Sequence, residues 1–189
     1  LLIYAGSGTD CVESHVWNPG STSWKDHIAS NHPGVSYPDS QVVFGDLDGD
    51  KTNYPVLFGL QNTGSGMIEL HAWGVGMQSW MYHIATNQPA VDPSKNIVEF
   101  GDINGDGADE AILVSLKDTG SGMVEFHVWH GGQWAWHSHH ASNMPAINPD
   151  DSKVVFADTD GNGSDEAVLV GLRNTGSGRV EFHVWNMWF

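Results

Sequence analysis

The feature that most constrains this chain is an aspartate-rich segment that recurs at a fixed period. The sequence Phe-Gly-Asp-Ile-Asn-Gly-Asp-Gly-Ala-Asp-Glu occupies residues 100–110, and two related copies lie 56 residues before and after it. The leading aspartates of the three copies are Asp46, Asp102 and Asp158. A period of this length predicts a series of stacked supersecondary units, each of which buries its apolar face against a neighbour.

A glycine-rich triplet marks a second fixed point of the repeat. Gly-Ser-Gly begins at Gly6, Gly64, Gly120 and Gly176, and a threonine precedes the last three copies. Glycine tolerates the positive φ angles of tight reversals, so the triplet predicts a hairpin turn between two strands. A phosphate-binding loop would need a helix after it, and the residues that follow are not helical in pattern.

Each turn is followed by a segment of alternating character. In the third copy Val124, Phe126 and Val128 share one face of the expected strand, and Glu125, His127 and Trp129 share the other. The same Glu-x-His-x-Trp face begins at residues 13, 69, 125 and 181. Structural networks recur with the architecture whereas catalytic sites are usually singular, so we favour a buried Glu–His hydrogen bond capped by tryptophan. An acid/base or metal pair is the alternative.

A fourth segment repeats a tryptophan and a histidine, for example Trp80 and His83. In the next copy His137, His139 and His140 form a cluster that is compatible with zinc. However, His139 belongs to the repeat, and strand alternation places His140 on the opposite face. A zinc site formed by these three residues is therefore not favoured.

Each unit contains four short strands, expected in one copy at about 98–101, 111–116, 123–129 and 134–141. A repeated four-stranded meander predicts the blades of a β-propeller. The second strand is apolar throughout, so both of its faces should be covered, as they are when blades stack. The rival all-β fold is a sandwich, but a sandwich gives no reason for a 56-residue period.

The whole chain, residues 1–189, is expected to form one repeat array. Its units cover about 1–41, 42–97, 98–153 and 154–189, and the first and last are partial. This amounts to about three and a third blades, whereas a propeller closes with four to eight. We therefore expect closure by oligomerisation, with a homodimer preferred, unless the chain is a piece of a longer propeller.

Composition excludes some partners. The chain carries 23 acidic against 7 basic residues, a formal net charge of −16, which argues against binding nucleic acid. It contains no run of about 18 apolar residues, so membrane insertion is not expected. Its single cysteine, Cys11, excludes an intrachain disulfide and a cysteine-based zinc site.

The aspartate segments, each preceded by a strand that ends in Phe-Gly or Phe-Ala, resemble FG-GAP and VCBS-type repeats. Such repeats build the propellers of integrin α-subunits and of many bacterial surface proteins, and they are similar to those of a mushroom lectin propeller. The resemblance covers the chain through its repeats. It implies a propeller stabilised by calcium, located outside the cell or at its surface, that binds sugars or proteins.

The resemblance also implies calcium ligands at loop positions 1, 3, 5 and 9, with a backbone carbonyl at position 7. The implied residues are Asp102, Asn104, Asp106, Ala108 and Glu110 in the second loop; Asp158, Asp160, Asn162, Ser164 and Glu166 in the third; and Asp46, Asp48, Asp50 and Thr52 in the first. The first loop departs from the pattern, with Tyr54 at position 9 and Lys51 in place of a glycine. An acidic turn without a metal is the alternative.

We expect a carbohydrate-binding module, because the 9 tryptophans offer flat apolar faces for sugar rings. The candidate ligand-binding residues are Trp24, Trp80, Trp136, Asn31, Asn87 and Asn143. The alternatives are a module that binds a cell-surface protein, as in adhesion, and a purely structural domain. No enzyme is expected, because the sequence shows no nucleophile elbow, metalloprotease helix or singular carboxylate pair.

Overall fold

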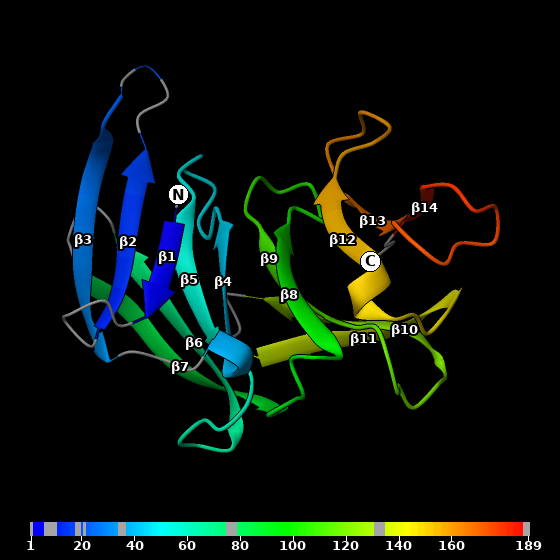
Figure 1. Ribbon diagram of the computed structural model, residues 1–189, viewed down its shortest axis with the longest axis horizontal. Helices are drawn as coiled ribbons and strands as arrows, with labels where there is room; N and C mark the ends of the chain where they lie inside the picture. The colour runs from blue at the N-terminus through cyan, green and yellow to red at the C-terminus, as the bar shows by residue number, and fades with distance from the viewer. Residues whose placement is uncertain are drawn as a thin grey trace.

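The computed structural model describes residues 2–5, 11–17, 20, 22–33, 37–74, 79–130 and 135–186, and these residues form an all-β structure (Figure 1). The described strands make four antiparallel sheets, which we name A to D in chain order. Sheet A contains β1 (Leu2–Ala5), β2 (Cys11–Trp17) and β3 (Trp24–Pro33). Sheet B contains β4 (Ser40–Gly45), β5 (Tyr54–Gly59), β6 (Met67–Gly74) and β7 (Ser79–Pro89). Sheet C contains β8 (Asn96–Gly101), β9 (Glu110–Ser115), β10 (Met123–His130) and β11 (Ala135–Pro145). Sheet D contains β12 (Ser152–Ala157), β13 (Glu166–Gly171) and β14 (Glu181–Trp185).

Every sheet is a meander, in which strands adjacent in sequence are adjacent in space. The four strands predicted for one repeat are confirmed in sheet C. The first begins two residues earlier than expected, at Asn96, and the last continues to Pro145. Sheets B, C and D begin at Ser40, Asn96 and Ser152, two residues before the unit boundaries that the sequence suggests.

Helical structure among the described residues is limited to two short 3₁₀ turns, η1 (Tyr37–Asp39) and η2 (Pro149–Asp151). Each turn leads directly into the first strand of a sheet. The Asn148 side chain caps η2 by accepting a hydrogen bond from the Asp150 amide. The described part of the chain contains no helix with the length and hydropathy needed to cross a membrane.

The last three Gly-Ser-Gly segments form the hairpin turns that the sequence predicts, and the first copy, at residues 6–8, lies outside the described residues. The Gly66, Gly122 and Gly178 amides donate to the carbonyls of the threonines three residues earlier. The φ angles of these three glycines lie between 68° and 72°, a region that residues with a Cβ rarely adopt. In sheets B, C and D these turns therefore connect the second strand to the third.

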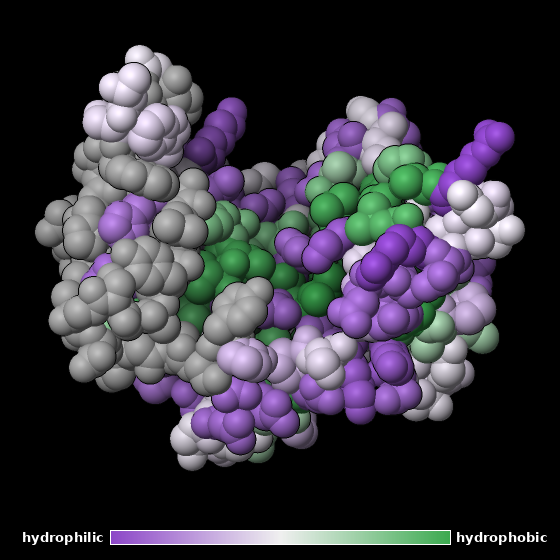
Figure 2. Space-filling model, in the orientation of Figure 1, coloured by the Kyte–Doolittle hydropathy of each residue, from purple (hydrophilic) through white to green (hydrophobic). Residues whose placement is uncertain are grey.

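Sheet C is covered on both faces, and strand β9 shows this best. Its residues alternate between two hydrophobic clusters, both fully buried. Ala111 and Leu113 pack with Phe58 and other residues of sheet B, whereas Ile112 and Val114 pack with residues of sheet D. Figure 2 shows apolar side chains gathered in the middle of one face, with hydrophilic side chains in the loops around them. A two-sheet sandwich would leave one face of such a strand exposed.

The first strands of sheets B, C and D lie next to one another, with β4 beside β8 and β8 beside β12. Their contact explains the Phe-Gly dipeptides of the repeat. The Phe100 ring packs against Gly45, and Phe156 packs against Gly101, so closely that a Cβ on either glycine would lie 2.4–2.5 Å from the phenylalanine. Each glycine is thus a recess for the phenylalanine of the following repeat.

The described strands form a row of stacked sheets, and no closed ring is found among them. A propeller and its closure by oligomerisation therefore stay predictions.

Gly45→Ala should destabilise the fold by about 1–3 kcal/mol, because the new methyl group would overlap the Phe100 ring in a packed junction. Gly120→Ala is the matched control, since a Cβ there meets no atom within 4 Å. Urea unfolding of the two variants measures the difference. Equal stability of the two variants would show that the Phe100–Gly45 contact does not constrain the junction.

Candidate functional site

The three aspartate loops connect the first and second strands of sheets B, C and D. In each loop the leading aspartate accepts a hydrogen bond from the amide of the glycine three residues later, at 2.6–2.8 Å. These glycines, Gly49, Gly105 and Gly161, have φ angles of 74–79°. The side chain at position 5 accepts from the amide at position 7, the residue whose carbonyl was expected to bind calcium: Asp50 from Thr52, Asp106 from Ala108, and Asn162 from Ser164.

The first loop brings three of its expected ligands together. One carboxylate oxygen each of Asp46, Asp48 and Asp50 lies within 4.8 Å of the others. Asp46 is buried, and its Oδ2 also accepts from the amide of Lys51, whose φ is 67°. Tyr54, at position 9, donates from its hydroxyl group to Asp50 at 3.3 Å.

The third loop also forms a carboxylate cluster. Oxygens of Asp158, Asp160 and Glu166 lie within 4.8 Å of one another. Glu166 is buried, and Thr159 donates to its Oε2 from both the amide and the hydroxyl group. Hydrogen bonds from backbone amides, led by that of Gly163, lower the pKa of Asp158.

The second loop is arranged differently, because position 3 is an amide. Asn104 Nδ2 donates to Glu110 Oε1 at 2.7 Å. Burial, followed by the charges of Asp106 and Asp102, raises the pKa of Glu110 to about 8. The first and third loops thus show converging carboxylates, while the second holds a carboxyl group whose ionisation is disfavoured by burial and by neighbouring negative charges.

Two functional residues escaped the sequence reasoning. Asp109 and Asp165 occupy position 8 of the second and third loops. The Asp46 amide donates to Asp109 Oδ2 at 2.8 Å, and the Asp109 amide donates back to the Asp46 carbonyl at 2.6 Å. Asp165 makes the same pair with Asp102, at 3.1 and 2.7 Å. Each loop is therefore bonded to the next one, and the recurrence of aspartate at position 8 was the available signal.

The expected sugar-binding residues do not form one surface. Trp80 is half-buried, with its ring 5.0 Å from that of Trp73 in an edge-on contact, and Trp136 packs against the core between sheets B and C. Asn87 Oδ1 accepts from the Trp136 amide at 3.0 Å, which links two sheets. The side chains of Trp24 and Asn31 lie outside the part that the structure describes.

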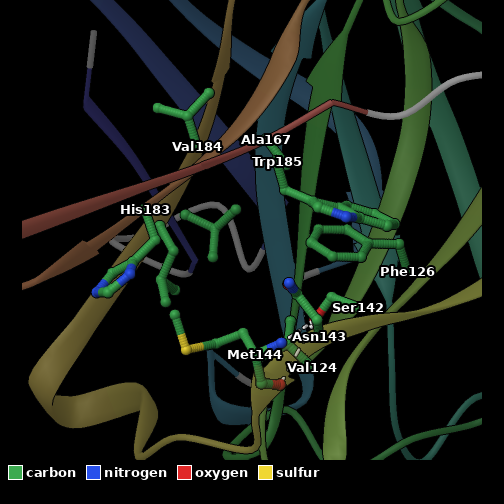
Figure 3. Close-up of a pocket in the computed structure, with 11 residues that line it drawn as sticks. Val124, Phe126, Ser142, Asn143, Met144, Ala167, His183, Val184 and Trp185 are labelled. Atoms are coloured by element: carbon green, nitrogen blue, oxygen red, sulfur yellow. Dashed lines mark hydrogen bonds between the residues drawn. The ribbon is translucent and has the colours of Figure 1, made fainter.

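Asn143 lies elsewhere, at a cavity of about 310 Å³ between sheets C and D (Figure 3). The rings of Phe126 and Trp185 are stacked at this cavity, 4.8 Å apart and inclined by 22°. Ser142 and His183 also line it. The cavity therefore combines flat aromatic surface with hydroxyl, amide and imidazole groups.

The histidines of β11 follow the alternation that the sequence predicts. His139 lies opposite His127 in the neighbouring strand, and His140 lies opposite Phe126, which belongs to the other face. The side chain of His137 lies outside the described part.

No family model matches the chain, and no curated protein matches it.

Glu110→Gln should make the calcium-free protein more stable at pH 9 and leave its stability nearly unchanged at pH 5. Glu110 has a pKa of about 8 in the folded state against an ordinary value of 4.5, so the folded state binds the extra proton between these values. Stability that depends on this proton is lost as the pH rises through about 8. Urea unfolding in EDTA at both pH values tests this.

Asp106→Asn is the companion variant. It removes a negative charge that raises the pKa of Glu110, so the pH range over which the protein loses stability should move to lower values. A pH dependence that is identical in the wild type and both variants would contradict the assignment to Glu110.

Proposed function

We propose that this chain is a calcium-binding repeat module of the FG-GAP/VCBS type that acts in extracellular recognition, with carbohydrate as its ligand class. The observation that carries the proposal is the convergence of carboxylate oxygens in the first and third loops. A hard divalent cation is their natural partner, and calcium accepts the mixture of carboxylate, amide and carbonyl oxygens that these loops offer.

The electrostatic cost of the loops supports a cation. Two unit charges 4.8 Å apart repel by about 3–4 kcal/mol at an effective dielectric constant of 20. The ion pairs of the described basic residues lie elsewhere: Lys95 pairs with Asp92 and Asp118, and Arg173 pairs with Asp151. A bound cation would offset the repulsion within each loop.

Such a cation would also stabilise the stacking of the sheets. The leading aspartates Asp46 and Asp102 bond through their backbones to the loops of the following sheets. A cation bound to a leading aspartate would also hold in place the residue that bonds to the loop of the next sheet. Calcium would then order the array as well as the single loop.

Saturating calcium should raise the melting temperature relative to EDTA, because a ligand that binds only the folded state at about 100 times its Kd contributes roughly 2.7 kcal/mol per site. Asp160→Asn should reduce the increase. The new amide can still accept the hydrogen bond from Asn162, so the fold is kept. Asp150→Asn, at an exposed carboxylate outside the loops, is the control. A melting temperature unaffected by calcium would refute the metal proposal.

The cavity between sheets C and D supports carbohydrate as the ligand class. Sugar rings place their apolar face on aromatic side chains and their hydroxyl groups on amides and hydroxyls. Trp185, whose ring stacks on the buried Phe126, supplies the first surface, and Asn143 and Ser142 supply the second.

Binding to a glycan array in calcium, with loss of the signal in Asn143→Ala, is the expected result for the carbohydrate function. Asn143 is exposed, so the substitution should leave the fold intact. Asn87→Ala, at the equivalent repeat position but away from this cavity, should bind as the wild type does. A wild-type chain that binds calcium but no glycan would favour the protein-binding alternative.

One observation favours the protein-binding alternative. Strand β14 is an edge strand within the described part, and Val180, Phe182 and Val184 are 53–68% exposed on and beside it. An exposed apolar edge is suited to the addition of a strand from a protein partner. A second copy of the chain is one such partner, and a two-fold dimer that closes a ring remains our preferred assembly.

A further inference from the structure

Sheets B and C each carry a cluster of one glutamate and two histidines. The histidines lie on the third and fourth strands, where the backbone register places His71 opposite His83 and His127 opposite His139. The rings of each pair are stacked, with centroids 4.3 Å apart and planes inclined by 12° in sheet B, and 4.5 Å and 15° in sheet C. The sequence places two imidazoles side by side in successive repeats.

The glutamate of sheet B is positioned by the hairpin turn before it. Glu69 Oε1 accepts hydrogen bonds from the Ser65 amide at 3.0 Å and from its hydroxyl group at 2.7 Å. Oε2 lies 3.8 Å from the Nε2 of His71 and 3.6 Å from the Nε2 of His83. One oxygen therefore orients the carboxylate, and the other faces both imidazoles.

Sheet C repeats the arrangement. Glu125 Oε1 accepts from the Ser121 amide at 2.9 Å, and Oε2 lies 3.2 Å from the Nε2 of His139. In both sheets one possible ligand atom from each of the three residues lies within 4.8 Å of the others.

We propose that Glu69, His71 and His83 form one binding site, and Glu125, His127 and His139 a second, for a borderline transition-metal ion such as Zn²⁺. Two imidazole nitrogens and a carboxylate oxygen suit zinc, whereas calcium prefers oxygen alone. Bond lengths of about 2.0–2.2 Å in a tetrahedral site place ligand atoms about 3.3–3.5 Å apart. The Glu69 carboxylate already lies 3.6–3.8 Å from both imidazole nitrogens, and the exposed His83 ring has to turn out of the stack so that its lone pair and that of His71 converge on one ion.

The burial of the three residues also fits a site that can be reached from solvent. The Glu69 and His71 side chains are only 16% and 11% exposed, so they are held in place, while His83 is 62% exposed and can adjust. His139 is similarly open, at 53%. The open side leaves the fourth coordination position to water or to an exogenous ligand.

A purely structural Glu–His pair explains less of this geometry. One histidine suffices for an ion pair, and a second stacked ring adds a like charge when both are protonated. A metal ion satisfies both neutral rings and the carboxylate at once.

The other sheets provide comparisons. In sheet D, Glu181 Oε2 lies 3.4 Å from His183 Nε2, and the described part of that sheet has no fourth strand to supply a second histidine. In sheet A, His15 lies opposite His27 in register, but the side chain of His27 lies outside the described part. Sheet D thus contains a natural incomplete site.

Calorimetric titration of the full chain with ZnCl₂, in millimolar calcium to occupy the aspartate loops, tests the proposal. The wild type should take up at least two equivalents. His83→Gln and His139→Gln should each bind one equivalent of zinc fewer, and the double variant should bind two fewer. The affinity at each altered site should fall by at least about tenfold, because even the loss of a residue that only supports a metal ligand costs about that much. His183→Gln, at the incomplete site, should retain the wild-type stoichiometry.

Co²⁺ provides an independent readout, because tetrahedral coordination gives intense visible absorption. The wild type should show this absorption and the double variant should not. Uptake should weaken below about pH 6, where protons compete for the imidazoles. Circular dichroism checks that the variants, altered at exposed rings, are folded. Absence of zinc uptake by the wild type, or full uptake by the folded double variant, would overturn the proposal.

Discussion

The structure depends on the burial of apolar second strands between neighbouring sheets, and strand β9 is buried from both sides. A single sheet of this protein cannot stand alone, because strands such as β9 are apolar on both faces. Stacking satisfies both faces, and it brings the first strands of neighbouring sheets into contact. The Phe100–Gly45 contact and the Asp46–Asp109 hydrogen bonds lie at this contact. The acidic loops are therefore arranged in a row as a consequence of core packing.

Much of this could be predicted from the sequence because the repeat supplies several internal copies. Alternation identified the strands, Gly-Ser-Gly identified the turns, and the apolar second strand identified the stacking. What could not be predicted were contacts between repeats. The aspartate at position 8 was visible as a recurring residue, but its partner lies 63 residues away in Asp46. A period indicates which residues are equivalent and does not indicate which of them touch.

The aspartate loops and the histidine clusters also differ in whether their residues are close together in the sequence. The aspartate loops are local in sequence, and the resemblance to FG-GAP and VCBS-type repeats implied that Asp158, Asp160 and Glu166 lie together, as they do. The second loop was unforeseen because a side-chain amide can donate as well as accept, and Asn104 donates to Glu110. The histidine pairs depend on register across a hairpin. A register irregularity between Val128 and Trp129 lies beside the pair, so counting residues from the turn cannot assign His139 to His127.

The two Phe–Gly contacts between sheets run in the same direction along the chain. A phenylalanine of the later sheet enters a glycine recess of the earlier one, so the array has a leading and a trailing face that are chemically distinct. On the trailing face the recess is filled, because Ala157 occupies the position of Gly45 and Gly101 and is exposed. A sheet that stacks there must present a smaller side chain than phenylalanine. Each junction is therefore directional, because its later sheet supplies the phenylalanine and its earlier sheet supplies the glycine.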